Sequence, residues 1–126
     1  MTHRSRVCAV LIDTSPQTHE TVSRFWSEAL GRELQFSPQE RYAALKGAQL
    51  DYLVQRVELG HEGVHIDIET DDVDAEVARL AKAGAKRIQQ IKTWWVMEDP
   101  GGHRFCVVPL QSTAWPEGAH EWTSSP

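Results

Sequence analysis

The pattern of hydrophobic and polar positions changes its period near the middle of the chain. Between residues 64 and 70 apolar and polar side chains alternate, with Ile66 and Ile68 on one side of the segment. A period of two is typical of a half-buried strand. The opposite side of this predicted strand is polar and carries His65, Asp67 and Glu69.

The segment that follows has the period of a helix. Apolar residues recur at helical spacing from Val73 to Ala81, with charged residues between them, which predicts a helix with one buried face. Asp71 or Asp72 is expected to cap its start, where a carboxylate suits the helix dipole. Gly84 is expected to end the helix in a left-handed conformation. A strand with one polar face therefore leads directly into a helix that covers the other face of the sheet.

The first half of the chain has the same order of elements. The apolar run from Arg6 to Asp13 predicts a central strand. Ser15 and Pro16 have the character of a helix cap and first turn, and Gly31 is expected to close that helix. The remaining strands predicted for this half span residues 33–36, 41–45 and 49–57.

The second half repeats this order after its own strand and helix. Tight-turn residues from Asp99 to Gly102 precede the last predicted strand. Each half is thus one strand, one helix and three further strands, which indicates a structural duplication within a single domain of residues 1–126. The remaining strands of this half are predicted at 87–92, 93–98 and 104–108, and the two modules at about 6–58 and about 63–110.

The end of the chain differs in composition from both modules. Residues 111–126 are rich in Ser, Thr, Pro and Gly, and we expect them to form an irregular tail. Trp115 and Trp122 are the large apolar residues that would hold this tail against the surface.

Composition and charge limit the functional classes to which this protein can belong. Among the 126 residues 40% are hydrophobic, enough for a compact core, and the net charge is −5 at pH 7. This charge argues against a nucleic-acid partner, which would need a basic stripe, and no apolar run is long enough to span a membrane. The basic start is followed by too short an apolar run for a signal peptide, so we expect a cytoplasmic protein. There Cys8 and Cys106 are expected to be buried thiols rather than a disulfide.

Three stretches carry a resemblance to a known family. They read FWSEALGRE, VHIDIETDDVDAEVARLAKAGA and WWVMEDPGGHRFCVV, and together they cover most of residues 7–108. In these motifs the chain resembles the vicinal oxygen chelate superfamily, in its glyoxalase-like and bleomycin-resistance branch. The resemblance implies an α+β fold of two βαβββ modules, whose curled mixed sheets surround a cleft. It also implies a homodimer, which would cover the apolar area of the tail tryptophans.

Enzymes of this superfamily place a divalent metal in the cleft, and only part of the expected ligand set is present here. His65 stands where the superfamily often has a ligand histidine, and Gln55 where it often has glutamate or glutamine. The other two positions fall on Cys106 and on or near Cys8. A divalent metal is therefore not favoured, and no cofactor is assigned. If zinc binds, Cys8, His65 and Cys106 would suit it, but we favour the interpretation that both thiols are small core residues.

The carboxylates beside His65 are candidates for proton transfer. Asp67 and Glu69 share its predicted polar face, and burial could raise the pKa of one of them into a useful range. In the simpler interpretation this face is solvated, or one carboxylate pairs with an arginine. The candidate catalytic residues are thus His65, Asp67 and Glu69.

Trp94 is the strongest candidate for contact with a ligand. If the last turn is centred near Gly101, then Val96 pairs with Cys106 and Trp94 with Val108. This pairing turns Trp94 toward the cleft, where an aromatic wall suits a planar or apolar molecule. The alternative is that Trp94 is simply a large core residue. The candidate ligand contacts are Trp94, Val96, Cys106 and Gln55.

Two functions from different classes follow from these residues. One is a protein that binds a small apolar or aromatic compound without catalysis. The other is a lyase or isomerase of the vicinal oxygen chelate type, either metal-dependent through His65 or using Asp67 or Glu69 as base. The incomplete ligand set favours the binding protein or a metal-free enzyme, and the identity of the ligand does not follow from these residues.

Overall fold

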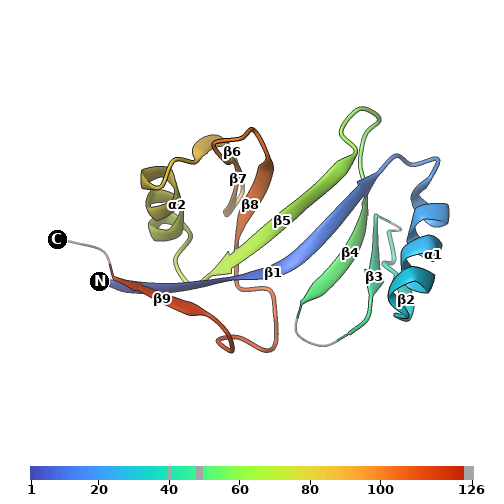
Figure 1. Ribbon diagram of the computed structural model, residues 1–126, viewed down its shortest axis with the longest axis horizontal. Helices are drawn as coiled ribbons and strands as arrows, with labels where there is room; N and C mark the ends of the chain where they lie inside the picture. The colour runs from blue at the N-terminus through green and yellow to red at the C-terminus, as the bar shows by residue number, and fades with distance from the viewer. Residues whose placement is uncertain (40, 48–49, 124–126) are drawn as a thin grey trace. The chain divides into compact units, whose positions relative to one another are not determined.

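The computed structural model describes residues 1–39, 41–47 and 50–123 (Figure 1). Strand, helix and three strands follow one another twice, which confirms the predicted α+β class with two βαβββ modules. The predicted start of one strand at Gln49 and the last residues of the tail, 124–126, lie outside the described residues. The elements are β1 (Thr2–Thr14), α1 (His19–Leu30), β2 (Leu34–Phe36), β3 (Tyr42–Leu45), β4 (Asp51–Arg56), β5 (Gly63–Thr70), α2 (Val73–Lys82), β6 (Lys86–Ile91), β7 (Trp94–Glu98), β8 (Arg104–Pro109) and β9 (His120–Thr123).

The chain forms two compact units. The terminal unit contains Met1–Cys8 and Ile66–Pro126, and the middle unit contains Ala9–His65. The strands β1 and β5 pass from one unit into the other. Within the described part of the chain, no helix is long and apolar enough to cross a membrane.

In the middle unit the strands lie in the order β2-β3-β4-β1. The second half of β1 runs parallel to β4, from Ala9 opposite Asp51 onwards, and the other pairs are antiparallel. The helix α1 covers this sheet, because its apolar residues Val22 and Trp26 pack against the core. The buried residues of that core are Ala43, Leu45 and Val54.

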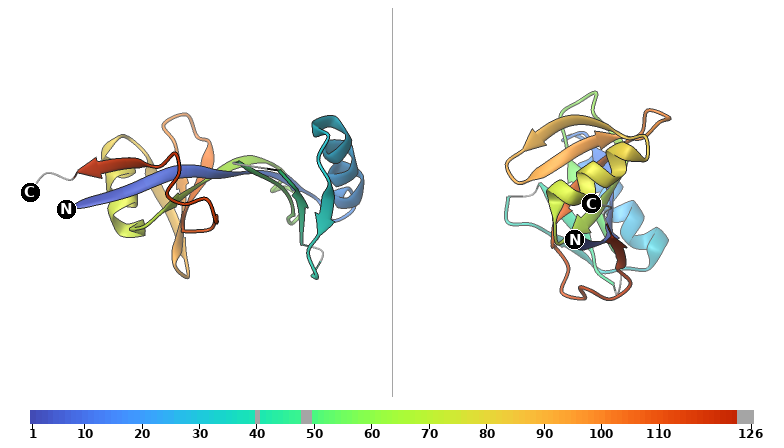
Figure 2. Two further views of the ribbon diagram at one scale, coloured as in Figure 1. Left: turned by 90° about the horizontal axis from the view of Figure 1, so that it is seen from below. Right: turned by 90° about the vertical axis from the view of Figure 1, so that its left-hand side faces the viewer.

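In the terminal unit the strands lie in the order β9-β1-β5-β8-β7-β6. The pair β5 and β8 is parallel, and β8, β7 and β6 are antiparallel neighbours. The apolar stripe of α2 packs onto this sheet, and Figures 1 and 2 show the helix beside β6, β7 and β8. The buried core residues are Val77, Met97 and Val107, surrounded by Val73, Leu80, Ala85, Trp95 and Phe105.

The two helices begin differently. Asp72 caps α2 as predicted, with its side chain accepting a hydrogen bond of 3.0 Å from the Ala75 N–H. The predicted cap at Ser15 and Pro16 is wrong, because α1 begins at His19. The Thr18 N–H donates to the Ser15 carbonyl in a turn that comes before the helix, so Pro16 lies in this turn rather than in the first helical turn.

The two helices end in the same way. After α2, the Gly84 N–H donates to the Ala81 carbonyl and the Ala85 N–H to the Leu80 carbonyl. After α1, the Gly31 N–H donates to the Glu28 carbonyl and the Arg32 N–H to the Ser27 carbonyl. This paired arrangement requires a left-handed residue at the helix end, and φ is +67° at Gly31 and +121° at Gly84. The sequence prediction of glycine-terminated helices is therefore confirmed at both positions.

The expected irregular tail is wrong over its last described residues. His120–Thr123 form β9, which pairs antiparallel with Thr2–Ser5 at the start of β1. Figure 2 shows β9 lying along the N-terminal part of β1. This partner also explains why β1 begins at Thr2, four residues before the start predicted from the apolar run. Trp122 does hold the tail, since its indole N–H donates to the Ser5 hydroxyl at 2.9 Å.

Candidate functional site

In the middle unit, His65 is paired with a carboxylate from another strand. His65 Nδ1 lies 2.7 Å from Asp13 Oδ2, and the two side chains are 16% and 12% exposed. Asp13 comes at the end of the apolar run of β1, and His65 lies near the start of β5. A carboxylate at Nδ1 orients the ring and favours the tautomer in which Nε2 is the nitrogen that would accept a proton or bind a metal. His65 is therefore oriented as a general base or a metal ligand requires.

Gln55 continues this row of polar side chains within the middle unit. It lies opposite Asp13 in the parallel pair of β1 and β4. Its side-chain amide donates to the Tyr42 hydroxyl at 3.3 Å, across the antiparallel pair of β3 and β4. Neighbouring strands thus supply the carboxylate, amide and phenol, and amide and phenol groups can each donate a hydrogen bond to an oxygen of a ligand.

In the terminal unit, the strand register brings other predicted residues to one face. Cys106 lies opposite Val96 on β7, which is the predicted pairing, and opposite Asp67 on β5. Trp94 is two residues from Val96 and therefore shares its face. Trp94 and Val96 are half-buried, and Cys106 is 9% exposed. An indole, an isopropyl group and a thiol form one surface, with the Asp67 carboxylate at its side.

The cysteines behave as buried thiols. Cys8 and Cys106 are both buried, and within the described residues neither forms a disulfide. Cys8 is 2% exposed, and its Sγ–H donates to the Asp67 carbonyl oxygen at 3.6 Å. Both properties agree with small core residues, and Cys106 in addition borders the surface of Trp94 and Val96.

Glu69 anchors the segment after β8. Its fully buried carboxylate accepts hydrogen bonds from Arg6 Nε at 2.6 Å, the Gln111 N–H at 2.7 Å, and the Ser112 N–H and hydroxyl at 2.9 and 2.6 Å. Burial alone would raise the pKa of Glu69, but these hydrogen bonds outweigh it and hold the pKa below its ordinary value. A general base needs a raised pKa, so we interpret Glu69 as a structural carboxylate paired with an arginine.

Sequence reasoning missed several of these partners. In the sequence Asp13 marks only the end of a predicted strand, although a carboxylate directly after an apolar run is a signal of a polar group at a strand end. Tyr42 and Arg6 carried no signal of their own. The structure identifies Tyr42 through its hydrogen bond with Gln55, and Arg6 through its hydrogen bond with Glu69.

The fold is similar to several solved structures. A hypothetical protein from Bacillus halodurans C-125 is 12% identical, with a TM-score of 0.64, over 87% of this chain and 97% of the other. An NAD-dependent benzaldehyde dehydrogenase from Legionella pneumophila is 17% identical, with a TM-score of 0.62, over 82% and 98%. A glyoxalase/bleomycin resistance protein/dioxygenase superfamily member from Vibrio splendidus 12B01 is 18% identical, with a TM-score of 0.51, over 82% and 98%. At such low sequence identities, these similarities show a shared fold and do not show a shared function.

Comparison at the level of sequence gives one match and one negative result. The family model described as Glyoxalase-like domain matches residues 9–108. No curated protein matches the chain. The matched range contains the helix–strand motifs of both halves of the chain.

Proposed function

The chain belongs to the glyoxalase-like domain family, within the vicinal oxygen chelate superfamily, and on this premise we propose that it binds a small apolar or aromatic molecule. The observation that carries the proposal is the surface of Trp94, Val96 and Cys106 in the terminal unit. A half-buried indole next to an aliphatic side chain offers contact area to a planar ligand. Asp67 at its edge would orient a polar substituent of that ligand.

Binding can be tested with a panel of aromatic compounds and a matched pair of variants. The panel is screened by ligand-observed NMR, and hits are titrated by calorimetry. We expect Trp94→Ala to weaken binding at least tenfold, because the indole supplies most of the apolar contact area, worth about 1.4 kcal/mol or more.

The control removes an aromatic side chain elsewhere. Phe25 on α1 is 61% exposed, so Phe25→Ala should leave the affinity unchanged. Thermal melts establish that both variants are folded. Unchanged affinity in Trp94→Ala would exclude this surface as the binding site.

A specific observation also favours a second function, a lyase or isomerase in which His65 acts on the substrate. The Asp13 carboxylate at 2.7 Å from His65 Nδ1 is the arrangement found behind histidine bases and behind metal-ligating histidines. His65 Nε2 therefore fits a divalent metal, which would polarise an oxygen of the substrate. Gln55, opposite Asp13, would supply the weaker oxygen ligand.

Metal analysis separates the two functions. Under the binding proposal, protein purified without added metal should contain no stoichiometric zinc, manganese or nickel. Under the second function metal binds, and Asp13→Asn should reduce its affinity roughly 10- to 100-fold while His65→Ala abolishes binding. His61→Ala is the matched control, because His61 is an exposed histidine of the same unit. Equal metal affinity in His65→Ala and His61→Ala would rule out the His65 site.

A further inference from the structure

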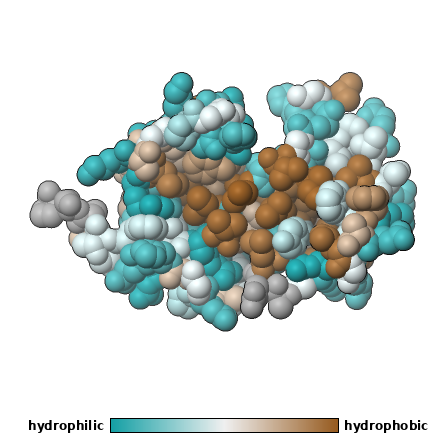
Figure 3. All heavy atoms as spheres, in the orientation of Figure 1, coloured by the Kyte–Doolittle hydropathy of each residue, from teal (hydrophilic) through white to brown (hydrophobic). Residues whose placement is uncertain are grey.

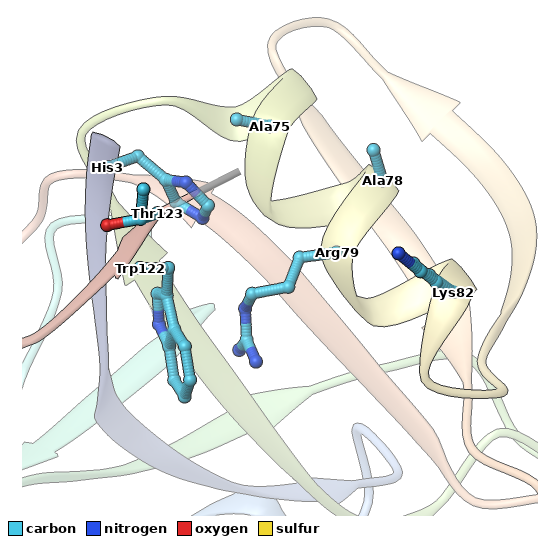
Figure 4. A pocket seen from close by; sticks show the side chains of 7 residues that line it. All are labelled: His3, Ala75, Ala78, Arg79, Lys82, Trp122 and Thr123. Atoms are coloured by element: carbon cyan, nitrogen blue, oxygen red, sulfur yellow. The ribbon is translucent and has the colours of Figure 1, made fainter. Parts of the chain in front are cut away.

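The terminal unit contains a pocket between α2 and the end of its sheet that is formed by β1 and β9. Its volume is about 470 Å³, within the range of small-molecule sites. Figure 4 shows its walls, which come from α2 and from the paired strands β1 and β9. The lining residues are His3, Ala75, Ala78, Arg79, Lys82, Trp122 and Thr123.

The sequence of α2 explains why a hollow forms here. Ala75, Ala78 and Lys82 are spaced three and four residues apart and lie on one side of the helix. Different residues of α2, including Val73 and Val77, pack onto the sheet. The two alanines carry only a methyl group each, so the helix leaves space between its backbone and β9.

A rigid guanidinium forms one wall of the pocket. Arg79 Nε and Nη2 donate to the two oxygens of Glu76 at 2.7 and 2.8 Å. Its guanidinium carbon lies 3.6 Å from the centre of the Trp122 ring. Figure 4 shows the two side chains beside each other. Glu76 is fully buried and is also 2.8 Å from His3 Nε2. Arg79 is therefore fixed in place before any ligand arrives, which reduces the entropy cost of binding.

The charge of the lining is positive. Glu76 balances Arg79, but among the described residues Lys82 has no carboxylate within ion-pair distance, and it is exposed. None of the described residues that line the pocket is acidic, although the chain as a whole carries a net charge of −5. Arg79 Nη1 retains N–H groups that do not point to Glu76, because Nε and Nη2 make that contact.

From these features we propose that this pocket binds a small organic carboxylate with a compact apolar body. The carboxylate would lie between Lys82 and Arg79 Nη1, where one group supplies net charge and the other supplies directed donors. The apolar body would lie on Ala75 and Ala78. This site is distinct from the surface of Trp94, which lies on the opposite face of the sheet from α2.

The test uses benzoate as probe and the full chain. Titration is followed by the backbone amide signals of residues 75–82 and the Trp122 indole signal in NMR spectra. We expect these signals to shift together, with a dissociation constant of roughly a millimolar for so small a ligand. Benzyl alcohol, which has the same ring and no charge, should bind at least tenfold more weakly.

Two variants with matched controls locate the site. Lys82→Gln should weaken benzoate binding about five- to tenfold, whereas Lys86→Gln, an exposed lysine outside the lining, should not. Ala78→Leu fills the hollow and should abolish the shifts, whereas Ala29→Leu on the exposed side of α1 should not. Trp94→Ala should leave benzoate binding at this site unchanged, which separates it from the proposed function.

Several results would overturn the proposal. They are the absence of shifts at residues 75–82 up to roughly 20 mM benzoate, equal binding of benzyl alcohol, or unchanged binding in Ala78→Leu. Unchanged binding in a folded Lys82→Gln variant would equally show that Lys82 does not bind the carboxylate of the ligand.

Discussion

At the scale of single residues, the buried carboxylates show how hydrogen bonding can outweigh burial. Glu69 and Glu76 are both fully buried. Burial would raise the pKa of each, yet hydrogen bonds hold both pKa values below the ordinary value of 4.5. A group whose pKa is lowered in the folded state contributes stability above its unfolded pKa. That stability is lost as the pH falls through the folded pKa.

We therefore expect the free energy of unfolding to decrease as the pH drops below about 4.5. Glu69→Gln should remove one titrating group and flatten this slope by up to about 1.4 kcal/mol per pH unit. It should also lower stability at pH 7, because Arg6 loses its charged partner. Urea unfolding from pH 3 to pH 7 measures both effects.

The control for Glu69→Gln is an exposed ion pair of the same unit. Glu121 pairs with Arg4 and is 54% exposed, so Glu121→Gln should change neither the slope nor the stability measurably. Identical pH profiles for Glu69→Gln and the unaltered protein would show that Glu69 does not couple stability to protonation.

At the scale of elements, the two helix ends differ in what surrounds their glycines. A Cβ added at Gly84 would lie 3.3 Å from Pro100 Cγ, and φ there is +121°. A Cβ added at Gly31, where φ is +67°, would meet nothing within 4 Å. Gly31→Ala should therefore cost about 1–2 kcal/mol for the left-handed backbone alone. Gly84→Ala should cost more than Gly31→Ala, because its φ is further from the left-handed minimum and Pro100 must move. Chemical denaturation of both variants checks the order, and a smaller loss in Gly84→Ala would contradict it.

At the scale of the whole molecule, apolar side chains remain at the surface of a single chain. In the terminal unit, Val7 on β1 is 45% exposed and Ile66 on β5 is 43% exposed. Figure 3 shows apolar side chains gathered on the face that it presents. We propose that a second copy of the chain covers such side chains, since exposed apolar surface is typical of an interface.

Light scattering should then give about 28 kDa at micromolar concentration, twice the 14.2 kDa of one chain. Ile66→Asp should shift the mass toward 14.2 kDa, because a carboxylate would be buried without a partner. Leu59→Asp is the control, since Leu59 is 74% exposed in the loop before β5. A single-chain mass for the unaltered protein would refute the dimer.

The order of the elements and the helix ends were predictable from short stretches of chain. These signals are local. They are the change of period between Ile68 and Val73, the cap at Asp72 and the glycines at 31 and 84, and each depends on only a few neighbouring residues. Period and capping depend on backbone geometry that is the same in every fold. The pairing of Val96 with Cys106 was predictable for the same reason, because a short turn sets the register.

The partners of the candidate site residues were not predictable in this way. Asp13 and His65 are 52 positions apart, and Glu69 and Ser112 are 43 apart. The strand β9 likewise needs the far end of the chain, since Trp122 and Ser5 are 117 apart. Nothing in a local pattern specifies which distant group will reach a carboxylate or an unpaired strand edge. Those contacts arise when the sheet orders its strands, which is why the residue types of the candidate site could be named from sequence while their chemistry depends on the folded chain.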